Sequence, residues 1–288
     1  MTYKMLKASV IQADGIESMR GSGKADVFAM LAHPVDHAKS PGMFNALFED
    51  RGLDSLMVPM SCVPEAFDQL WAGLTAMSNL RGVIVSIPFK ARVLEKAETA
   101  HPRAKRVGAA NVLRRLPSGG WEADNFDGLG FLLGMKAAGH QIAGKRVLQV
   151  GAGGGGSSIA YCLAEAGATE LTLADIDTLR VTQLAKGVQA AFPACKVRVG
   201  PADPVGMDLV VNATPVGMKS DDPLPFPVDR LTAAMTVVDI IMEPRETRLL
   251  SEARRRGCRV QPGQPMMDCQ MRAIAEFFDV DRNHRHVG

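Results

Sequence analysis

The stretch KRVLQVGAGGGG, residues 145–156, decides the fold, because it joins a short apolar run to a turn made almost entirely of glycine. A buried strand at 146–150, followed at once by this turn and a helical stretch, is typical of a dinucleotide-binding unit. Gly151 then allows the tight turn, Gly153 lets a pyrophosphate approach the backbone, and Gly156 lets helix and strand pack closely. The helix N-terminus attracts the phosphates.

An acidic residue strengthens this interpretation, since a glycine-rich turn alone joins many strands and helices for structural reasons. The next apolar run ends at Asp175, 24 positions after Gly151, where a carboxylate accepts hydrogen bonds from the adenine ribose hydroxyls. An exposed loop aspartate is the structural alternative. The predicted cofactor-binding residues of this unit are Gly151, Ala152, Gly153, Gly154, Gly155, Gly156 and Asp175.

The same aspartate bears on the choice of cofactor. A carboxylate repels a 2′-phosphate, and no arginine follows Asp175 immediately, so the sequence favours NAD over NADP. Arg180 lies about one helical turn further on and partly offsets that repulsion. The prediction is therefore a preference for NAD that leaves NADP open.

Short apolar runs alternate with longer amphipathic segments from residue 25 onward, which is the pattern of β-α-β units and of parallel sheets covered by helices. We therefore expect an α/β protein. A chain of 288 residues accommodates two ordinary domains, although one large domain is possible on length alone. The expected strands are 27–31, 56–60, 83–87, 146–150, 170–174, 209–212 and 236–240.

The boundary between two such domains is expected near Gly128. A hairpin around the turn PSGG, 117–120, precedes it, and Asp127 is expected to cap a helix that ends near Gly139. A last helix over 266–278 is expected to fold back onto the first domain. The predicted division is a substrate-binding catalytic domain, 1–127 with 262–288 returning to it, and a dinucleotide-binding domain, 128–261.

Composition narrows the class further. A hydrophobic share of 47% with a formal net charge of +2 from interspersed signs indicates a folded protein and gives no reason to expect nucleic acid binding. Five scattered cysteines, none in a CxxC pair, favour a reducing cytoplasm over a disulfide framework or a zinc site. No stretch approaches the roughly 18 apolar residues that span a bilayer, and the six histidines give little support for metal catalysis. We expect a cytoplasmic protein without metal.

Several further segments resemble those of the shikimate and quinate dehydrogenase family, in the same order along nearly the whole chain from about residue 26. They are HPVDHAKSP at 33–41, SIPFK at 86–90, GAAN at 108–111, DNFDG at 124–128, NATPVGM at 212–218, and Gln270 in the last helix. The resemblance implies an N-terminal α/β substrate domain with a Rossmann-type domain, and reversible hydride transfer between nicotinamide and a secondary alcohol. It also connects the chain with aromatic amino acid biosynthesis.

In that family the residues that match Lys90 and Asp127 form the catalytic pair. The resemblance implies that Lys90 is the general acid/base, and that Asp127 hydrogen-bonds the reacting hydroxyl and orients the lysine. The chemistry requires such a group, because the hydroxyl proton must leave while hydride moves to nicotinamide. The alternative is that Lys90 begins a solvated helix and Asp127 only caps another.

The resemblance also assigns contacts to substrate and cofactor. It places Asn111 at a substrate hydroxyl, Ser40 at the substrate carboxylate and Gln270 as an amide donor, while Ser86 keeps the hydroxyl of a family threonine. A turn asparagine, an N-cap serine before a proline and a polar helix position are the structural alternatives, and both roles are open to Ser40. The residues expected beside the nicotinamide are Ala213, Thr214, Gly217 and Met218, with a loop hydroxyl as the alternative for Thr214.

Four departures from the family pattern fall around the expected substrate pocket: Ala38 for a serine, Ile84 for an asparagine, Phe126 for a threonine and Met242 for a tyrosine. Each missing hydrogen bond typically costs about 0.5–1.5 kcal/mol of binding. We therefore expect shikimate, quinate or a related cyclic hydroxy acid, or else an amino-substituted or less oxygenated ring. A dinucleotide-binding sensor without turnover is a third hypothesis, and either a monomer or a homodimer is expected.

Overall fold

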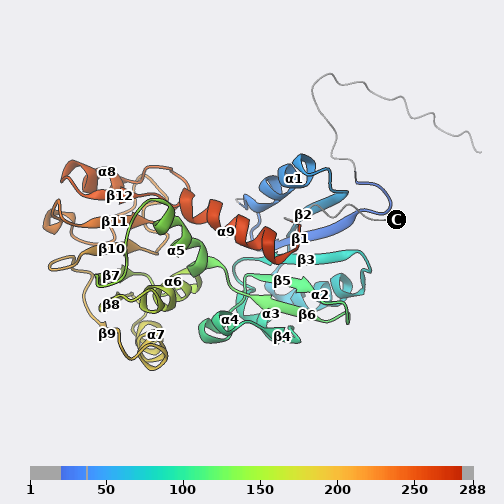
Figure 1. Ribbon diagram of the computed structural model, residues 1–288, viewed down its shortest axis with the longest axis horizontal. Helices are drawn as coiled ribbons and strands as arrows, with labels where there is room; N and C mark the ends of the chain where they lie inside the picture. The colour runs from blue at the N-terminus through green and yellow to red at the C-terminus, as the bar shows by residue number, and fades with distance from the viewer. Residues whose placement is uncertain (1–20, 37, 281–288) are drawn as a thin grey trace, which may run out of the picture.

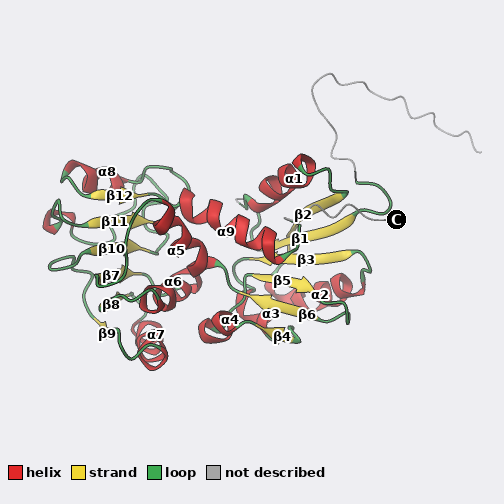
Figure 2. Ribbon diagram, in the orientation of Figure 1, coloured by secondary structure: helices red, strands yellow, loops and turns green. Residues whose placement is uncertain are grey.

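The computed structural model describes residues 21–36 and 38–280 of the chain. It shows two lobes side by side, each built on a six-stranded sheet, with the helices α5 (Asp127–Ala137) and α9 (Gln264–Phe277) lying between them (Figure 1). Both lobes carry helices on the faces of their sheets (Figure 2), so the chain is a two-domain α/β protein.

The first sheet has the strand order β2-β1-β3-β5-β6-β4. Strands β1 to β3 run parallel, whereas β5 pairs antiparallel with both β3 and β6. Its strands are β1 (Asp26–Ala32), β2 (Ser55–Ser61), β3 (Leu80–Val85), β4 (Thr99–Ala100), β5 (Val112–Arg115) and β6 (Trp121–Asp124). Its helices are α1 (Ser40–Asp50), η1 (Pro64–Ala66), α2 (Phe67–Ala76), α3 (Lys90–Leu94) and α4 (Pro102–Val107).

Strand β1 shows how this domain buries both faces of its sheet. Alternate residues of a strand point to opposite faces. Accordingly Ala29 and Leu31 belong to a core with Phe67 of α2, whereas Phe28 belongs to a second core with Phe44 of α1 and with residues of α9. Helix α9, although it lies far along the sequence, is therefore part of the core of the first domain.

The second sheet is parallel throughout and has the order β12-β11-β10-β7-β8-β9. When β7 to β12 are numbered 1 to 6, the order read from the β9 edge is 3-2-1-4-5-6, which is the doubly wound arrangement. In this arrangement the ligand crevice lies where the strand order reverses, which is here between β7 and β10. Its elements are β7 (Arg146–Val150), α6 (Gly154–Glu165), β8 (Glu170–Ala174), α7 (Thr178–Ala191), β9 (Lys196–Val199), β10 (Leu209–Asn212), η2 (Val228–Arg230), β11 (Thr236–Asp239), α8 (Arg248–Arg255) and β12 (Arg259–Gln261).

Glycines allow α5 to pack closely against its neighbours. A Cβ atom on Gly134 would lie 2.9 Å from the backbone nitrogen of Met266 in α9, and one on Gly130 would lie 2.7 Å from Cβ of Gln270. On another side of α5, a Cβ on Gly128 would lie 2.4 Å from the carbonyl oxygen of Ser158 in α6. The position of α5 between the domains therefore depends on the absence of side chains here.

We expect Gly134→Val to lower the free energy of unfolding by about 3 kcal/mol, because overpacking of this size forces the backbones of α5 and α9 apart. Chemical denaturation followed by circular dichroism measures the change. Gly73→Val is the matched control, since Gly73 lies in α2 and no atom of the described residues is within 4 Å of its Cβ position. Equal effects of the two substitutions would contradict the close-packing explanation.

The expected strands are all present, with small differences at their ends. The strand expected at 83–87 is β3, Leu80–Val85; it ends earlier because Ile87 is outside the sheet and 70% exposed. Two expected helix caps are wrong. The N-cap position of α1 is Lys39 rather than Ser40, and that of α5 is Phe126 rather than Asp127, with no side-chain cap in either case. Both residues instead begin their helices and turn their side chains toward a cavity.

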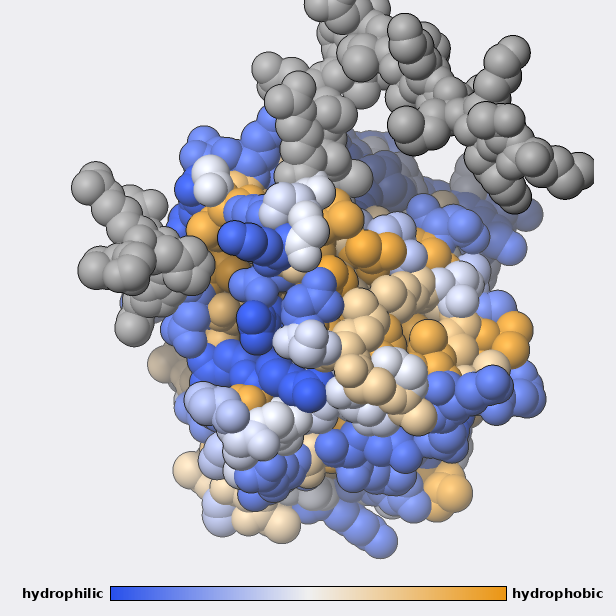
Figure 3. Space-filling model, turned by 90° about the vertical axis from the view of Figure 1, so that its right-hand side faces the viewer, coloured by the Kyte–Doolittle hydropathy of each residue, from blue (hydrophilic) through white to orange (hydrophobic). Residues whose placement is uncertain are grey.

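The domain boundaries stay a prediction: the first domain is 1–127 together with 262–288, and the second is 128–261. Residues 1–20 and 281–288 of the first domain lie outside the described residues. No helix in the described part of the chain is long and apolar enough to cross a membrane. The end of the molecule formed by the first domain shows hydrophobic areas next to hydrophilic ones (Figure 3).

Candidate active site

A cavity of about 410 Å³ opens where the carboxyl ends of β1 and β3 face α5 and α9. The six predicted catalytic and substrate-binding residues come from six different segments of the sequence: the start of α1, the loop after β3, the start of α3, the residue before β5, the start of α5, and the middle of α9. All six line this cavity: Ser40, Ser86, Lys90, Asn111, Asp127 and Gln270.

Asp127 is the centre of the polar side of the cavity. Its Oδ2 lies 2.7 Å from Nζ of Lys90, and its Oδ1 accepts hydrogen bonds from Nδ2 of Asn111 at 2.8 Å and Nε2 of Gln270 at 2.7 Å. The side chains of Asp127 and Lys90 are 9% and 17% exposed. The arrangement holds a largely buried carboxylate and an amine at the edge of a cavity, which is the geometry that a proton-transfer pair requires.

These contacts determine the charge of Asp127. Burial alone would raise the pKa of the Asp127 carboxyl, but the charge and hydrogen bond of Lys90, with the amides of Gln270 and Asn111, hold it below its ordinary value. Asp127 is therefore a carboxylate at neutral pH and keeps Lys90 oriented through an ion pair.

We expect Asp127→Asn to lower the free energy of unfolding at pH 7 by about 3 kcal/mol, because it leaves Lys90 without its counterion. The pKa of Asp127 is depressed in the folded state, so its stabilisation is full above the unfolded pKa of about 3.9 and is lost as pH falls through the lower folded pKa. The gap between wild type and variant should therefore narrow below about pH 4 in urea denaturation. Asp221→Asn, at an exposed position, is the control; a gap that widens in acid would contradict this account.

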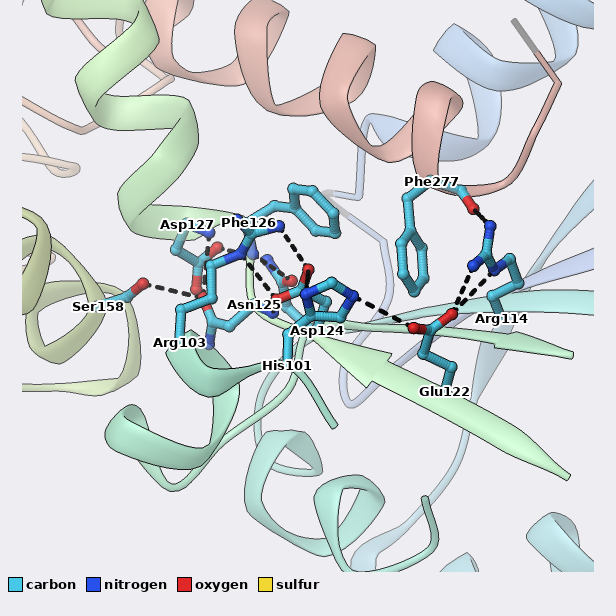
Figure 4. A network of polar contacts seen from close by, with 11 residues as sticks. His101, Arg103, Arg114, Glu122, Asp124, Asn125, Phe126, Asp127, Ser158 and Phe277 are labelled. Atoms are coloured by element: carbon cyan, nitrogen blue, oxygen red, sulfur yellow. Dashed lines mark hydrogen bonds and ion pairs between the residues drawn. The ribbon is translucent and has the colours of Figure 1, made fainter. Parts of the chain in front are cut away.

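A buried network behind Asp127 fixes the turn from β6 into α5 (Figure 4). Oδ1 of Asn125 accepts hydrogen bonds from the backbone nitrogen of Asp127 at 3.1 Å and from Oγ of Ser158 at 2.9 Å. Ser158 in turn accepts a hydrogen bond from the backbone nitrogen of Gly128 at 2.8 Å. Neither Asn125 nor Ser158 was predicted as a site residue, although Asn125 lies in the segment DNFDG.

Asp124 anchors the same turn from the other side. Nε of Arg103 donates to Oδ1 of Asp124 at 2.7 Å, and that oxygen also accepts from the backbone nitrogen of Asn125 at 2.7 Å. Burial raises the pKa of the Asp124 carboxyl, although Arg103 opposes the shift. In Figure 4 His101 bridges Asp124 to Glu122, so the network continues along β6 away from the cavity.

The departures from the family pattern divide into two groups. Ala38 and Ile84 line the cavity, together with Met30, Met267 and Met271, so one side of it is apolar. Phe126 does not line the cavity but packs beneath the guanidinium of Arg103, whose Cζ lies 4.6 Å from the ring centroid. Met242 is not among the lining residues.

A second depression, of about 560 Å³, lies in the dinucleotide-binding domain at the carboxyl ends of β7, β8 and β10. The predicted residues Gly151, Gly153, Asp175, Ala213 and Thr214 line it. Gly151 has φ +106°, and a Cβ on Gly156 would lie 2.4 Å from the carbonyl oxygen of Gly151. Around a Cβ on Gly153, by contrast, no atom of the described residues is within 4 Å. The groove thus has an open backbone at the N-terminus of α6, and its residues fit a dinucleotide.

The other predicted cofactor residues lie around this groove in different ways. Ala152 donates its backbone N–H to Asp175, and Gly154 places the start of α6 beside Lys90, since its Cβ position is 3.8 Å from Cδ of Lys90. A Cβ on Gly155 would lie 4.0 Å from Cδ1 of Ile240. Gly217 and Met218 do not line the groove, and the Met218 side chain is 52% exposed.

Two side chains stabilise the glycine turn itself. Asp175 accepts hydrogen bonds from the backbone nitrogens of Ala152 at 2.6 Å and Asp177 at 2.8 Å. Nε2 of the buried Gln149, a residue not predicted from the sequence, donates to the carbonyls of Gly151 and Gly156, both at 2.8 Å. The hydroxyl of Thr214 donates a hydrogen bond to Oδ1 of Asn212 at 2.7 Å, which is the contact expected of a hydroxyl that only stabilises its own loop.

Within the described residues, no group of three or more histidine, cysteine or acidic side chains is arranged to hold a metal ion. The site itself combines the pair of Lys90 and Asp127 with the adjoining dinucleotide groove. The doubly wound sheet, the glycine turn and this adjoining pair define a two-domain oxidoreductase.

Comparison with known proteins gives its family. Residues 30–113 match the family model for the shikimate dehydrogenase substrate binding domain. A shikimate dehydrogenase (NADP⁺) from Rubrobacter xylanophilus is 35% identical over 256 residues, which are 86% of this chain and 88% of that protein. The chain therefore belongs to the shikimate dehydrogenase family and is an enzyme.

Two solved structures show how far the likeness extends. Shikimate 5-dehydrogenase from Listeria monocytogenes, in complex with shikimate and NAD, has a TM-score of 0.83 at 28% identity over 91% of this chain and 93% of that one. Quinate dehydrogenase from Corynebacterium glutamicum, in complex with NAD, has a TM-score of 0.81 at 28% identity over 88% and 93%. Both domains and their relative placement are thus those of the family.

Proposed function

We propose that this enzyme catalyses NAD(P)-dependent, reversible oxidation of a secondary alcohol on shikimate, quinate or a related cyclic hydroxy acid, with Lys90 and Asp127 as the catalytic pair. The observation that carries the proposal is the 2.7 Å contact of Lys90 with Asp127 at the edge of the cavity, next to the glycine turn. The names of the Rubrobacter and Listeria proteins support the reaction and the substrate class.

In this proposal, cofactor binding, proton transfer and positioning of the reacting groups belong to different residues. The glycine turn 151–156 and Thr214 hold the cofactor, whose nicotinamide ring accepts or supplies the hydride when it is bound. Lys90 moves the proton to or from the reacting oxygen through its Nζ atom. Asp127 orients Lys90 and hydrogen-bonds the reacting hydroxyl, while Asn111 and Gln270 hold Asp127 in place and contact the substrate beside it.

A panel of alcohols tests the proposal. Shikimate, quinate, an amino-substituted analogue and a ring with fewer hydroxyls are each supplied with NAD and with NADP, and reduced nicotinamide is followed by absorbance. We expect turnover of at least one ring acid. Because Ala38 and Ile84 make part of the cavity apolar, the ring with fewer hydroxyls is the second candidate substrate. Binding of cofactor without turnover of any alcohol would contradict the proposal.

We further propose that NAD is preferred to NADP. The carboxylates of Asp175 and Asp177 lie at the end of β8, and Nη2 of Arg180 is 3.0 Å from Asp177, so the arginine is already paired with an acid. A 2′-phosphate here meets negative charge. The relatives leave the choice open, since the Rubrobacter protein is named for NADP⁺ and the Listeria structure contains NAD.

Asp175→Asn tests this preference, because it removes the charge and keeps an oxygen that accepts from Ala152. We expect the ratio of kcat/KM for NAD to that for NADP to fall about tenfold, the change that corresponds to about 1.4 kcal/mol. Asp203→Asn, in the same domain but outside the groove lining, is the control. An unchanged ratio would contradict a role for the Asp175 charge. The monomer or homodimer expected from the sequence stays a prediction.

A further inference from the structure

The loop before α1 contributes a lysine to the substrate cavity. Ala38, Lys39 and Ser40 all line it, and Ala38 stands where the family pattern has one of two serines expected to bind the substrate carboxylate. The cavity therefore lacks this hydroxyl at Ala38, and the next residue along the chain, which also lines the cavity, is a lysine. The Ser40 side chain remains and is buried.

The charges of the cavity are unevenly distributed. Among the charged side chains that line it, Lys90 and Asp127 form an ion pair with each other. The counterion of Lys39 is Glu243, whose Oε1 lies 2.6 Å from Nζ, and Glu243 is not a lining residue. Within the part of the chain that the structure describes, a carboxylate that enters the cavity thus finds one lysine whose counterion, Glu243, is not a lining residue.

That counterion belongs to the other domain. Glu243 follows β11 in the loop that begins with Ile240, and Ile240 lies beside the glycine turn at Gly155. The contact between Lys39 and Glu243 therefore joins the substrate loop to the cofactor-binding half of the enzyme. Lys39 holds the pKa of Glu243 below its ordinary value through its hydrogen bond and charge.

We propose that Lys39 is the residue that binds the carboxylate of the substrate, and that Glu243 competes with the substrate for it. This proposal rests on the proposed function and specifies one contact of the same site. Exchange is inexpensive, because Lys39 keeps an anionic partner throughout and the released Glu243, 65% exposed, returns to water. Lys39 thereby replaces, as the partner of the carboxylate, the serine hydroxyl that the family pattern has at the position of Ala38.

The proposal predicts opposite effects for the two members of the pair. Lys39→Met should weaken binding of an acid but have much less effect on a neutral analogue, whereas Glu243→Gln should strengthen binding of the acid by freeing Lys39. Lys39→Arg keeps the charge and should restore most of the loss. A merely structural contact between the domains predicts that both neutralising substitutions change the acid and the analogue alike.

The experiment compares shikimate with its methyl ester, which has the same ring and no charge, in wild type and variants at fixed cofactor. We expect Lys39→Met to lower the acid-to-ester ratio of kcat/KM by about tenfold or more, mainly through KM, as for a lost hydrogen bond to a charged group. Glu243→Gln should raise the ratio. Lys105→Met, at an exposed position of α4, is the control.

An unchanged ratio in Lys39→Met, or a lower ratio in Glu243→Gln, would overturn the proposal even when the wild-type enzyme is active. If wild type turns over neither compound, the proposed substrate class fails first. Calorimetric titration of shikimate into wild type and Lys39→Met with NAD present then decides the contact separately: weaker binding by the variant supports it, and equal binding or no binding to either protein overturns it.

Discussion

Replacing Lys90 by methionine is expected to lower kcat by about 10²–10⁴-fold, the range in which a positioned general acid or base typically contributes. Methionine keeps an unbranched side chain but removes the amine that lies 2.7 Å from Asp127. Cofactor affinity should change little, because the Lys90 atom recorded beside the glycine turn is the methylene carbon Cδ, 3.8 Å from the Cβ position of Gly154, and methionine keeps apolar atoms there. Steady-state kinetics with the best alcohol of the panel measures kcat, and fluorescence titration measures cofactor binding.

A second substitution tests whether Lys90 acts together with Asp127. Residues that act as a unit give strongly non-additive losses, so the double variant Lys90→Met, Asp127→Asn should be little slower than the slower single variant. Lys136→Met, at an exposed position of α5, controls for loss of a lysine from the same protein. Losses that multiply, or full activity in Lys90→Met, would contradict the assignment of a catalytic pair.

Replacing Gly153 by valine is expected to weaken cofactor binding at least about 100-fold, a loss of about 2.7 kcal/mol, without a comparable loss of stability. Gly153 lines the groove at the N-terminus of α6, its φ of −69° suits any residue, and among residues 21–36 and 38–280 no atom lies within 4 Å of its Cβ position. The side chain therefore fits the protein but occupies the space where a phosphate approaches the backbone. Fluorescence titration and thermal unfolding measure the two effects.

Gly156 provides the contrasting case within the same turn. A Cβ there meets the carbonyl oxygen of Gly151 at 2.4 Å, so Gly156→Val should reduce both stability and cofactor binding. Gly73→Val in α2, far from the groove in the sequence and open around its Cβ, should change neither property much. Normal cofactor affinity in Gly153→Val would show that the open backbone at this turn is not where the dinucleotide binds.

The buried strands were predictable because each is a short continuous apolar run in a parallel arrangement. The two edge strands of the second sheet were not. In β9 at one edge, Lys196–Val199 is mostly exposed, and β12 at the other edge has only the three residues Arg259–Gln261, so neither leaves a clear hydrophobic pattern. The two predicted N-caps were wrong for a different reason. Ser40 and Asp127 are good capping residues by type, but their side chains line the cavity instead of capping a helix.

The candidate site was predicted residue by residue only through the resemblance to a family. No spacing rule brings Lys90, Asp127 and Gln270 together, because they lie in three helices whose packing depends on the whole fold. The supporting residues Asn125 and Ser158 were missed because an asparagine in a turn and a serine in a helix are common and carry no local signal. Only their mutual hydrogen bond across 33 positions reveals their role.

The placement of α9 has a consequence for the order in which the protein is made. Gln270 and Met271 line the substrate cavity, and Ile274 completes the core of the first domain, yet the ribosome synthesises them only after the whole second sheet, 146–261. Domains generally fold as units during synthesis, with the N-terminal one first. Here the first domain cannot complete its core until α9 has been synthesised. A nascent chain that stops at residue 261 is therefore expected to have a cofactor groove but an incomplete substrate cavity.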